Sequence, residues 1–383
     1  MPAYVIAVAA LPLLVWMCML AARGGFWNVR AQTLFAQQLE PRHARIAAVI
    51  PARDEAEYVA EAVASLLRQA DVDLRIFLVD DQSSDGTAAA AVKSAETAGR
   101  ASELSVITGS PPPPGWTGKL WAVKQGIDRA LETSPEFLLL TDADIAHAPG
   151  SISRLVALAE RDQRDLVSLM VRLQCDTFAE HLLIPAFVFL FLMLYPPRWI
   201  AHPHTRTAGA AGGCMLLRPG ALAAIGGVER IRGEIIDDCA LAGAIKKSGG
   251  RVWLGLADDS VSLRPYTTFC AIGNMIARSA FSQLRHSALQ LIGTVVGLTL
   301  CFLLPVILLL TREPLLIALG AAAWLLMTMC YLPMVRFYRR NPLWALTLPA
   351  AAVFYMGATV VSAVRFWRGR GGQWKGRAQD VTP

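Results

Sequence analysis

The chain has 383 residues, of which 54% are hydrophobic and 17% are charged, and its mean hydropathy is +0.42. This composition is too apolar for an ordinary soluble enzyme. The formal net charge of +6 suits an anionic lipid surface and an anionic substrate. The seven cysteines are scattered singly, without zinc-type spacing, and no basic face studded with aromatic residues points to nucleic acid as a partner.

The chain begins with an uncharged apolar stretch, residues 3–22, close to the roughly 20 residues that a helix needs to cross a bilayer. No charged region precedes it and no small-residue cleavage site is evident, which favours an uncleaved anchor over a signal peptide. Four arginines follow, at positions 23, 30, 42 and 45. The positive-inside rule therefore predicts that the next domain is cytoplasmic, in a multi-pass protein of the cell inner membrane.

Short apolar runs then alternate with helical periodicity from residue 45 to about residue 266. The runs "RIAAVIPA", "LRIFLVDD", "ELSVITG" and "FLLLTDAD" are typical of strands, and the segments between the first three and before the fourth are typical of helices. In "EAEYVAEAVASLLRQA" one helix face carries Val59, Val63, Leu66 and Leu67. We therefore predict an α/β domain over residues 45–287, with a mostly parallel sheet and helices on both faces.

A polar loop follows each of these four strands: "PARDE", "DDQSSDGT", "GSPPPPGWTGK" and "DAD". Taken alone, "DAD" is equally typical of a solvated strand-to-loop turn. In parallel sheets, however, ligands bind at the carboxyl ends of the strands. Four such loops at one edge predict a binding site there.

Asp142 and Asp144 stand one residue apart at the end of the fourth strand. Paired carboxylates are hard-oxygen ligands for Mg²⁺ or Mn²⁺, which share their other positions with substrate phosphates. Lys119 can reach the same phosphates, although a lone loop lysine is usually solvated. The chain lacks both the Gly-x-x-x-x-Gly-Lys-[Ser/Thr] loop and a Gly-x-Gly-x-x-Gly turn after the first strand, which narrows the choice towards nucleotide-sugar chemistry.

The apolar run "LLIPAFVFLFLMLYPP", residues 182–197, contains three prolines. A crossing at this point would place the motifs downstream of it on the opposite side of the membrane from Asp142. We therefore expect an interfacial or buried segment rather than a transmembrane helix.

Three more apolar segments, residues 288–310, 315–335 and 343–364, predict a membrane domain over residues 288–364, followed by a basic tail, residues 365–383. Four full crossings in all would place this tail outside, against the positive-inside rule. Three crossings, with the last segment re-entrant or interfacial, would keep every basic cluster inside. The length of the last uncharged run favours four, and both topologies stay open.

Five motifs occur in the order seen in family 2 glycosyltransferases of the GT-A fold: "VIPARDEAEYV", "LVDDQSSDGTA", "LTDADI", "AAGGCMLLR" and "IDDCALA". The resemblance covers about residues 46–290. Further sequence motifs, including "GWTGKLWA", "SLRPY" and "GRGGQWKGR", are similar to those of the hopanoid-biosynthesis-associated branch. The resemblance implies a nucleotide-sugar-binding GT-A domain, a divalent metal ion (Mg²⁺ or Mn²⁺), and transfer of a hexosyl or N-acetylhexosaminyl group to a lipid acceptor in a membrane.

The resemblance also implies roles for individual residues. Asp238 matches the catalytic base, although an Asp-Asp pair alone is equally typical of a helix N-terminus. Asp142 and Asp144 match the metal–diphosphate motif. The other residues expected to contact the nucleotide sugar are Pro51, Arg53 and Glu55 in the nucleotide pocket, Asp80 and Asp81 at the base, Gly212 and Gly213 near sugar and acceptor, and Lys119, Asp237 and Arg285.

Two departures from the family pattern matter. Asp54 stands where the first motif usually has Asn, which alters either the base contacts or the loop alone. The segment "SQLRHS" lacks the Trp of the Gln-x-x-Arg-Trp motif of processive members, which favours single-sugar transfer. We therefore expect an inverting transferase acting on a hopanoid. The alternatives are a polyprenyl phosphate, carotenoid or diacylglycerol acceptor, or a catalytically degenerate membrane scaffold.

Overall fold

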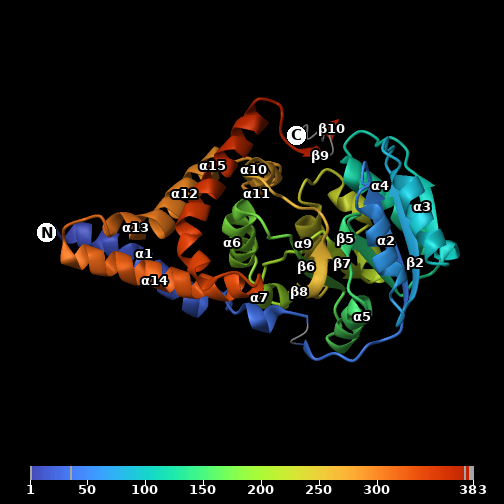
Figure 1. Cartoon of the computed structure of the whole chain (residues 1–383), viewed down its shortest axis with the longest axis horizontal. Helices are drawn as coiled ribbons and strands as arrows, with labels where there is room; N and C mark the ends of the chain where they lie inside the picture. Colours follow the sequence, from blue (N-terminus) through green and yellow to red (C-terminus); the bar gives the residue numbers. More distant parts are fainter. Residues whose placement is uncertain (1, 35–36, 375–376, 379–383) are drawn as a thin grey trace. The chain divides into compact units, whose positions relative to one another are not determined.

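The computed structural model describes residues 2–34, 37–374 and 377–378. Contacts divide the chain into two compact units (Figure 1). The α/β unit comprises Ala31–Gln174, Trp199–Pro265 and Gly372–Pro383, and the helical unit comprises Met1–Arg30, Cys175–Arg198 and Tyr266–Gly371.

An eight-stranded sheet forms the centre of the α/β unit, in the order β3-β2-β1-β4-β7-β6-β8-β5. The first four strands are parallel, as predicted from the sequence. Strand β7 runs antiparallel to both of its neighbours, so the sheet is mixed. The strands are β1 Arg45–Ala52, β2 Asp73–Asp80, β3 Leu104–Thr108, β4 Phe137–Thr141, β5 Ile145–Ala146, β6 Leu166–Arg172, β7 Cys214–Leu217 and β8 Val252–Ser262, with β9 Gln373–Trp374 and β10 Arg377–Ala378 in a separate pair.

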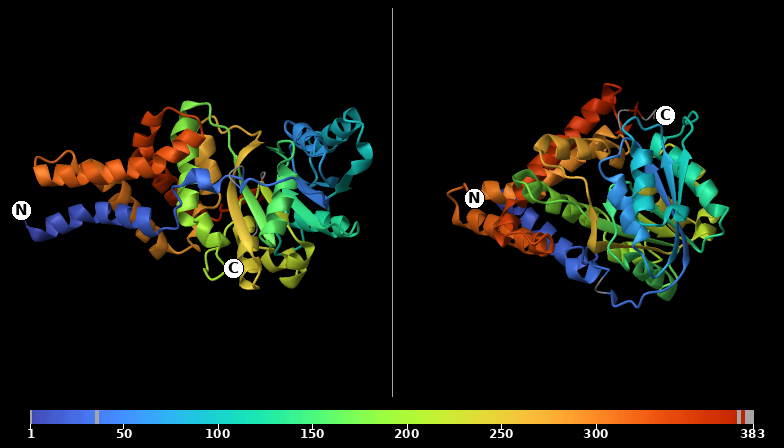
Figure 2. Two further views of the ribbon diagram at one scale, coloured as in Figure 1. Left: turned by 90° about the horizontal axis from the view of Figure 1, so that it is seen from below. Right: turned by 45° about the vertical axis from the view of Figure 1, so that its right-hand side comes forward.

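Helices cover both faces of this sheet, as predicted (Figure 2). The predicted apolar face of α2 (Val59–Leu67) is buried and packs with Ile46, Ala48 and Ile50 of β1. Side chains alternate across a strand, so Val49 points to the other face, where it meets α4 (Gly118–Leu131). At Gly126 of α4 a Cβ would lie 2.4 Å from Val49 Cγ1, so this helix approaches the sheet closely because the residue is glycine.

The remaining helical elements of the chain outside the candidate membrane spans are short. They are η1 Val29–Gln32, α3 Thr87–Thr97, η3 Ala101–Glu103, α5 Ser151–Arg161, α8 Pro219–Ala224, η4 Val228–Ile231, α9 Asp237–Lys247, α10 Phe269–Ala277 and α11 Ala280–Gln283.

Five helices are long and apolar enough to cross a membrane, judged by length and composition within the described residues. The first, α1 (Ala3–Ala22), matches the predicted anchor. Three lie in the predicted membrane domain: Ala288–Leu308 (α12 Ala288–Leu298, η5 Thr299–Leu303 and α13 Leu304–Leu308), α14 Pro314–Phe337, and Pro342–Trp367 (η6 Pro342–Thr347 and α15 Leu348–Trp367). The fifth, Phe178–Ala201, contains α6 (Phe178–Leu194) and α7 (Pro197–Ala201) and includes the segment predicted to be interfacial.

Candidate active site

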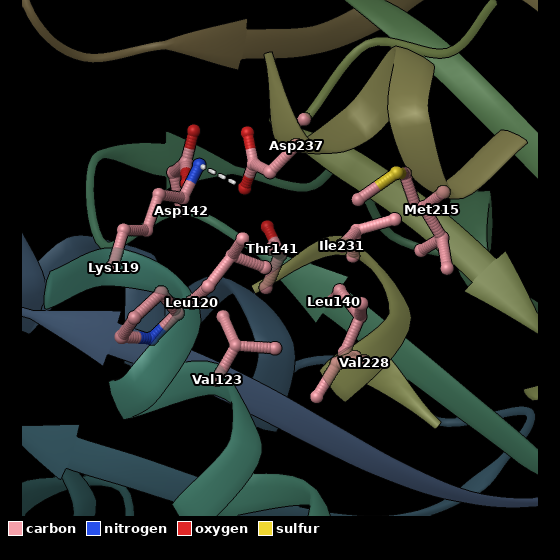
Figure 3. A pocket seen from close by; sticks show the side chains of 13 residues that line it. Lys119, Leu120, Val123, Leu140, Thr141, Asp142, Met215, Val228, Ile231 and Asp237 are labelled. Atoms are coloured by element: carbon pink, nitrogen blue, oxygen red, sulfur yellow. Dashed lines mark ion pairs between the residues drawn. The ribbon is translucent and has the colours of Figure 1, made fainter. Parts of the chain in front are cut away.

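Three charged side chains from three elements meet at the carboxyl edge of the sheet (Figure 3). Lys119, in the first turn of α4, places its Nζ 2.9 Å from Asp142 Oδ1 and 3.6 Å from Asp237 Oδ2. Burial lowers the pKa of Lys119, but Asp142, Asp237 and Asp238 outweigh it, so that the pKa ends well above its ordinary value. Lys119 is therefore a permanent cation that links the end of β4 to the start of α9.

Asp238 lies beside this cluster, in the first turn of α9. Its Oδ2 accepts a hydrogen bond from Gly212 N at 2.8 Å, and its Oδ1 accepts one from Cys239 N at 2.7 Å. Burial raises the pKa of Asp238 to about 6, with a further contribution from the charge of Asp237, against the opposing effect of Lys119. A carboxylate with such a pKa is ionised at neutral pH and matched to general-base work.

Gly212 separates the base candidate from the lysine. A Cβ at this position would lie 3.4 Å from Asp238 Oδ2 and 3.5 Å from Lys119 Nζ. Gly212 therefore lies in contact range of both charged groups, and a Cβ there would just touch each of them. Gly213 is packed more tightly, since its Cβ would lie 3.2 Å from Val171 Cγ2.

Asp144, the second member of the predicted metal pair, contacts a residue to which the sequence analysis gave no role. Arg264, just after β8, donates from Nε to Asp144 Oδ2 at 2.8 Å and from its terminal NH₂ to Glu55. Its guanidinium also lies 4.8 Å from the ring centre of Tyr58. Burial and the neighbouring Asp142 raise the pKa of Asp144, and Arg264 opposes this shift.

The donor set fits a divalent ion only in part. No group of three or more His, Cys, Asp or Glu side chains suited to a metal occurs within the part of the chain that the structure describes. Asp142 and Asp144 supply two hard carboxylates, and Mg²⁺ commonly binds through one or two carboxylates together with substrate phosphates and water. The residues present therefore fit an ion whose coordination is completed by a diphosphate.

The loops after β1 and β2 are joined by hydrogen bonds. Arg53 donates from NH1 to the backbone oxygen of Asp81 at 2.7 Å and to its Oδ2 at 3.3 Å. Asp80 Oδ1 accepts from Ser83 N at 2.9 Å, and Glu55 N donates to the hydroxyl of Thr87 at 2.8 Å. The segments after β1 and β2, which carry residues predicted to bind the nucleotide, are thus held together by Arg53 and Glu55.

Asp54, the departure from the family pattern, has a backbone φ of 49° in the left-handed region. Its N–H donates to Ser83 Oγ at 3.0 Å, and its Oδ1 accepts from Ser84 N at 2.9 Å. The Asp54 Oδ1 atom, as a hydrogen-bond acceptor, therefore holds the loop after β1 to the loop after β2. This geometry favours the interpretation in which Asp54 shapes the loop.

Residues 47–226 match the model of glycosyl transferase family 2. The chain carries a glycosyl transferase family 2 domain. A search of curated protein sequences gives no match.

The solved structures that the chain matches include the following three. The mannosyltransferase PcManGT from Pyrobaculum calidifontis, in complex with GDP-Man and Mn²⁺, has 16% identity and a TM-score of 0.52 over 93% of this chain and 99% of that one. TarS from S. aureus has 15% identity and a TM-score of 0.37 over 62% and 40%. Glucosyl-3-phosphoglycerate synthase from M. tuberculosis has 19% identity and a TM-score of 0.37 over 61% and 76%. The first of these shows that the family 2 domain has the GT-A fold.

The predicted site residues of the α/β unit lie at the carboxyl edge of the sheet. Pro51, at the end of β1, lines the same pocket as Lys119, Asp142 and Asp237. Arg285 belongs to the helical unit, between α11 and α12, with φ 51°. Its contact with the nucleotide sugar stays a prediction.

A buried chain of hydrogen bonds supports the end of β4, directly before Asp142. The Thr141 hydroxyl donates to Gly213 O at 2.8 Å, so its 2.9 Å contact with His147 Nε2 requires the imidazole to donate. Burial lowers the pKa of His147 to about 4, and the ring is therefore neutral at pH 7. These hydrogen bonds tie the end of β4, next to Asp142, to the backbone of Gly213, next to Gly212. This hydrogen-bond chain could not be predicted from the sequence, where its one trace is a His shortly after "DAD".

Replacing Thr141 by Val should destabilise the fold by about 1–3 kcal/mol, because it leaves Gly213 O and the His147 N–H buried without their partner. Thr97→Val is the matched control: Thr97 is exposed on α3 and bonds only within its own helix. That change should stay within about 0.5 kcal/mol. Denaturant unfolding of the two variants measures the difference, and equal losses would contradict a structural role for the Thr141 hydroxyl.

Proposed function

We propose that this chain is a membrane-bound, inverting glycosyltransferase that moves one sugar from a nucleotide-diphosphate sugar to a lipid acceptor. The observation that carries the proposal is the juxtaposition of Lys119, Asp142 and Asp238 around Gly212. A fixed cation and a carboxylate at a strand end suit a diphosphate, and a second carboxylate with a raised pKa suits a hydroxyl that must lose its proton. The similar mannosyltransferase structure holds a nucleotide sugar and Mn²⁺.

In the proposed mechanism Asp238 accepts the proton of the acceptor hydroxyl. Each of its oxygens accepts one backbone N–H and keeps a lone pair for the acceptor. The acceptor oxygen then bonds to the anomeric carbon as the bond from that carbon to the diphosphate breaks. Lys119 stabilises the negative charge that develops on the leaving group.

Asp142 and Asp144 would hold a Mg²⁺ or Mn²⁺ ion, which when bound neutralises charge on the leaving diphosphate. Arg264 keeps the Asp144 carboxylate oriented towards the site through its Nε hydrogen bond. Lys119 keeps Asp142 oriented in the same way. Side chains from outside the β4–β5 loop thus position both carboxylates of that loop.

The acceptor is proposed to be amphiphilic, because the family 2 domain is part of a chain with five candidate membrane spans. The likeness to the hopanoid-associated branch makes a hopanoid the first choice. A polyprenyl phosphate, a carotenoid and diacylglycerol are the alternatives within the same chemistry.

We place α6 in the membrane interface rather than across the membrane. In sequence it lies between β6 and β7, which pair within a single sheet. A single crossing by α6 would put these two strands on opposite sides of the bilayer. Their pairing therefore supports an interfacial or re-entrant α6.

The α/β unit is proposed to be cytoplasmic, which thiol labelling of intact cells can test. In a background with the exposed Cys18 and Cys270 replaced by serine, Ser102→Cys provides an exposed probe in this unit. We expect a membrane-impermeant reagent to leave it unlabelled until the cells are lysed. Labelling in intact cells would overturn the cytoplasmic placement.

A cysteine appended after Pro383, in the same background, distinguishes the two topologies of the tail. Labelling from outside supports four spans, and protection in intact cells supports three.

The purified protein tests the transferase proposal when it is incubated with membrane lipid extract, Mn²⁺ and a panel of nucleotide sugars. Mass spectrometry should reveal a new lipid heavier by one sugar residue. A catalytically degenerate scaffold would yield no product with any donor, and it would not bind nucleotide sugars in a metal-dependent manner.

A further inference from the structure

An apolar pocket opens directly beneath the charged cluster of the candidate active site. Figure 3 shows Lys119, Asp142 and Asp237 gathered at one end of it and aliphatic side chains at the other. The aliphatic end is formed by Val123, Leu140, Met215, Val228, Ile231 and Leu241, all of them buried.

This aliphatic end offers a ligand no unused side-chain hydrogen-bonding group among the described lining residues. Thr141 is the uncharged polar side chain there, and its hydroxyl is already bonded to Gly213 O and His147. A sugar hydroxyl placed in this end would lose water without gaining a partner, which typically costs roughly tenfold or more in affinity. A methyl group would lose nothing and would bury apolar surface.

The charged end of the pocket belongs to the donor side of the proposed mechanism. Its charged end consists of Asp142 and Lys119, which face the leaving diphosphate in the proposed mechanism, together with Asp237. Asp238, which would receive the acceptor hydroxyl, turns its carboxylate to the backbone of Gly212 and does not line the pocket. A group attached to the transferred sugar can therefore enter, whereas the acceptor approaches Asp238.

We propose that the transferred sugar carries a methyl group that occupies this pocket, as in a 2-acetamido sugar or a 6-deoxy sugar, in preference to a sugar that bears only hydroxyls. This inference rests on the proposed function and specifies its donor. In a 2-acetamido sugar the amide would remain at the charged end and its methyl would enter. In a 6-deoxy sugar the C6 methyl would enter instead.

Donor pairs that share a nucleotide test the proposal by isothermal titration calorimetry on the full chain with Mn²⁺. UDP-N-acetylglucosamine is compared with UDP-glucose, and GDP-6-deoxymannose with GDP-mannose. In at least one pair the methyl-bearing donor should bind roughly tenfold or more tightly, and the pair that shows this identifies the source of the methyl. Equal or weaker binding of both methyl-bearing donors, with the parent sugars bound, overturns the pocket proposal and leaves the transferase proposal intact. Metal-dependent binding of none of these donors, together with no lipid product from the wider panel of nucleotide sugars, overturns the transferase proposal itself.

Val123→Leu fills part of the aliphatic end and should reduce the preference within the discriminating pair to about twofold or less. Val156→Leu is the matched control, since Val156 is as deeply buried but packs in the core on the other face of the sheet. It should leave the preference unchanged. If Val123→Leu raises the lipid concentration needed to saturate transfer but leaves the donor preference unchanged, the pocket binds the acceptor and the proposal is wrong. The donor comparison on the unmodified chain stands by itself if Val123→Leu does not fold.

Discussion

Replacing Asp238 by Asn is expected to slow the chemical step about 10²–10⁴-fold, the range typical of general acid–base catalysis. The side chain keeps its size, but it loses the group that accepts the proton of the acceptor hydroxyl. Nucleotide-sugar affinity should change little, because Lys119 and Asp142, the residues proposed to face the diphosphate, are unchanged. Single-turnover transfer and calorimetric donor binding separate the two effects.

Asp237→Asn is the control for this experiment. Asp237 is a neighbour in the same helical turn, and its contact with Lys119 is the longer of that lysine's two ion pairs, 3.6 Å against 2.9 Å. Its loss should therefore cost much less than the loss of Asp238. If Asp237→Asn abolishes transfer and Asp238→Asn does not, the base is Asp237. If neither change slows transfer, the assignment of a base to "IDDC" fails.

The same base should give the unmodified enzyme a characteristic pH dependence. Burial raises the pKa of Asp238 to about 6 in the free protein, and only the deprotonated form accepts a proton. The value of kcat/KM should therefore fall as the pH drops below about 6. The residual activity of Asp238→Asn should lack this acidic limb.

Asp142→Ala and Asp144→Ala should each abolish transfer. A single remaining carboxylate does not hold a divalent ion against water while the ion bridges a diphosphate. Excess chelator should likewise stop the unmodified enzyme, and added Mg²⁺ or Mn²⁺ should restore it. Asp128→Ala is the control, since Asp128 is an exposed residue of α4 that pairs with Lys124. Full turnover in excess chelator would rule out the metal.

Much of the sheet could be predicted from the sequence. Strands β1, β2 and β4 are mainly apolar runs that end in polar loops, which is a strong local signal. Strand β7, within "AAGGCMLLR", is only four residues long, and its direction is set by the path of the chain rather than by any residue in it. The mixed character of the sheet was therefore not predictable from local pattern.

The candidate site likewise contains residues that local sequence predicts and residues whose role depends on the fold. The sequence identified Lys119, Asp142 and Asp238 because each lies in a motif, and the structure brings them together around Gly212. Arg264 was missed because its role depends on Asp144, 120 residues earlier in the chain. A solvated arginine and one that orients a distant carboxylate have the same local sequence.

The stereochemistry of the product tests the central claim, a single displacement at one site, most directly. With a donor whose sugar is α-linked to the diphosphate, direct attack by the acceptor hydroxyl inverts the anomeric carbon. The one-bond carbon–proton coupling constant of the anomeric position, measured by NMR on the isolated glycolipid, should therefore report a β-linkage. An α-linked product would show that the anomeric configuration is retained and would contradict a mechanism in which Asp238 deprotonates the acceptor for in-line attack.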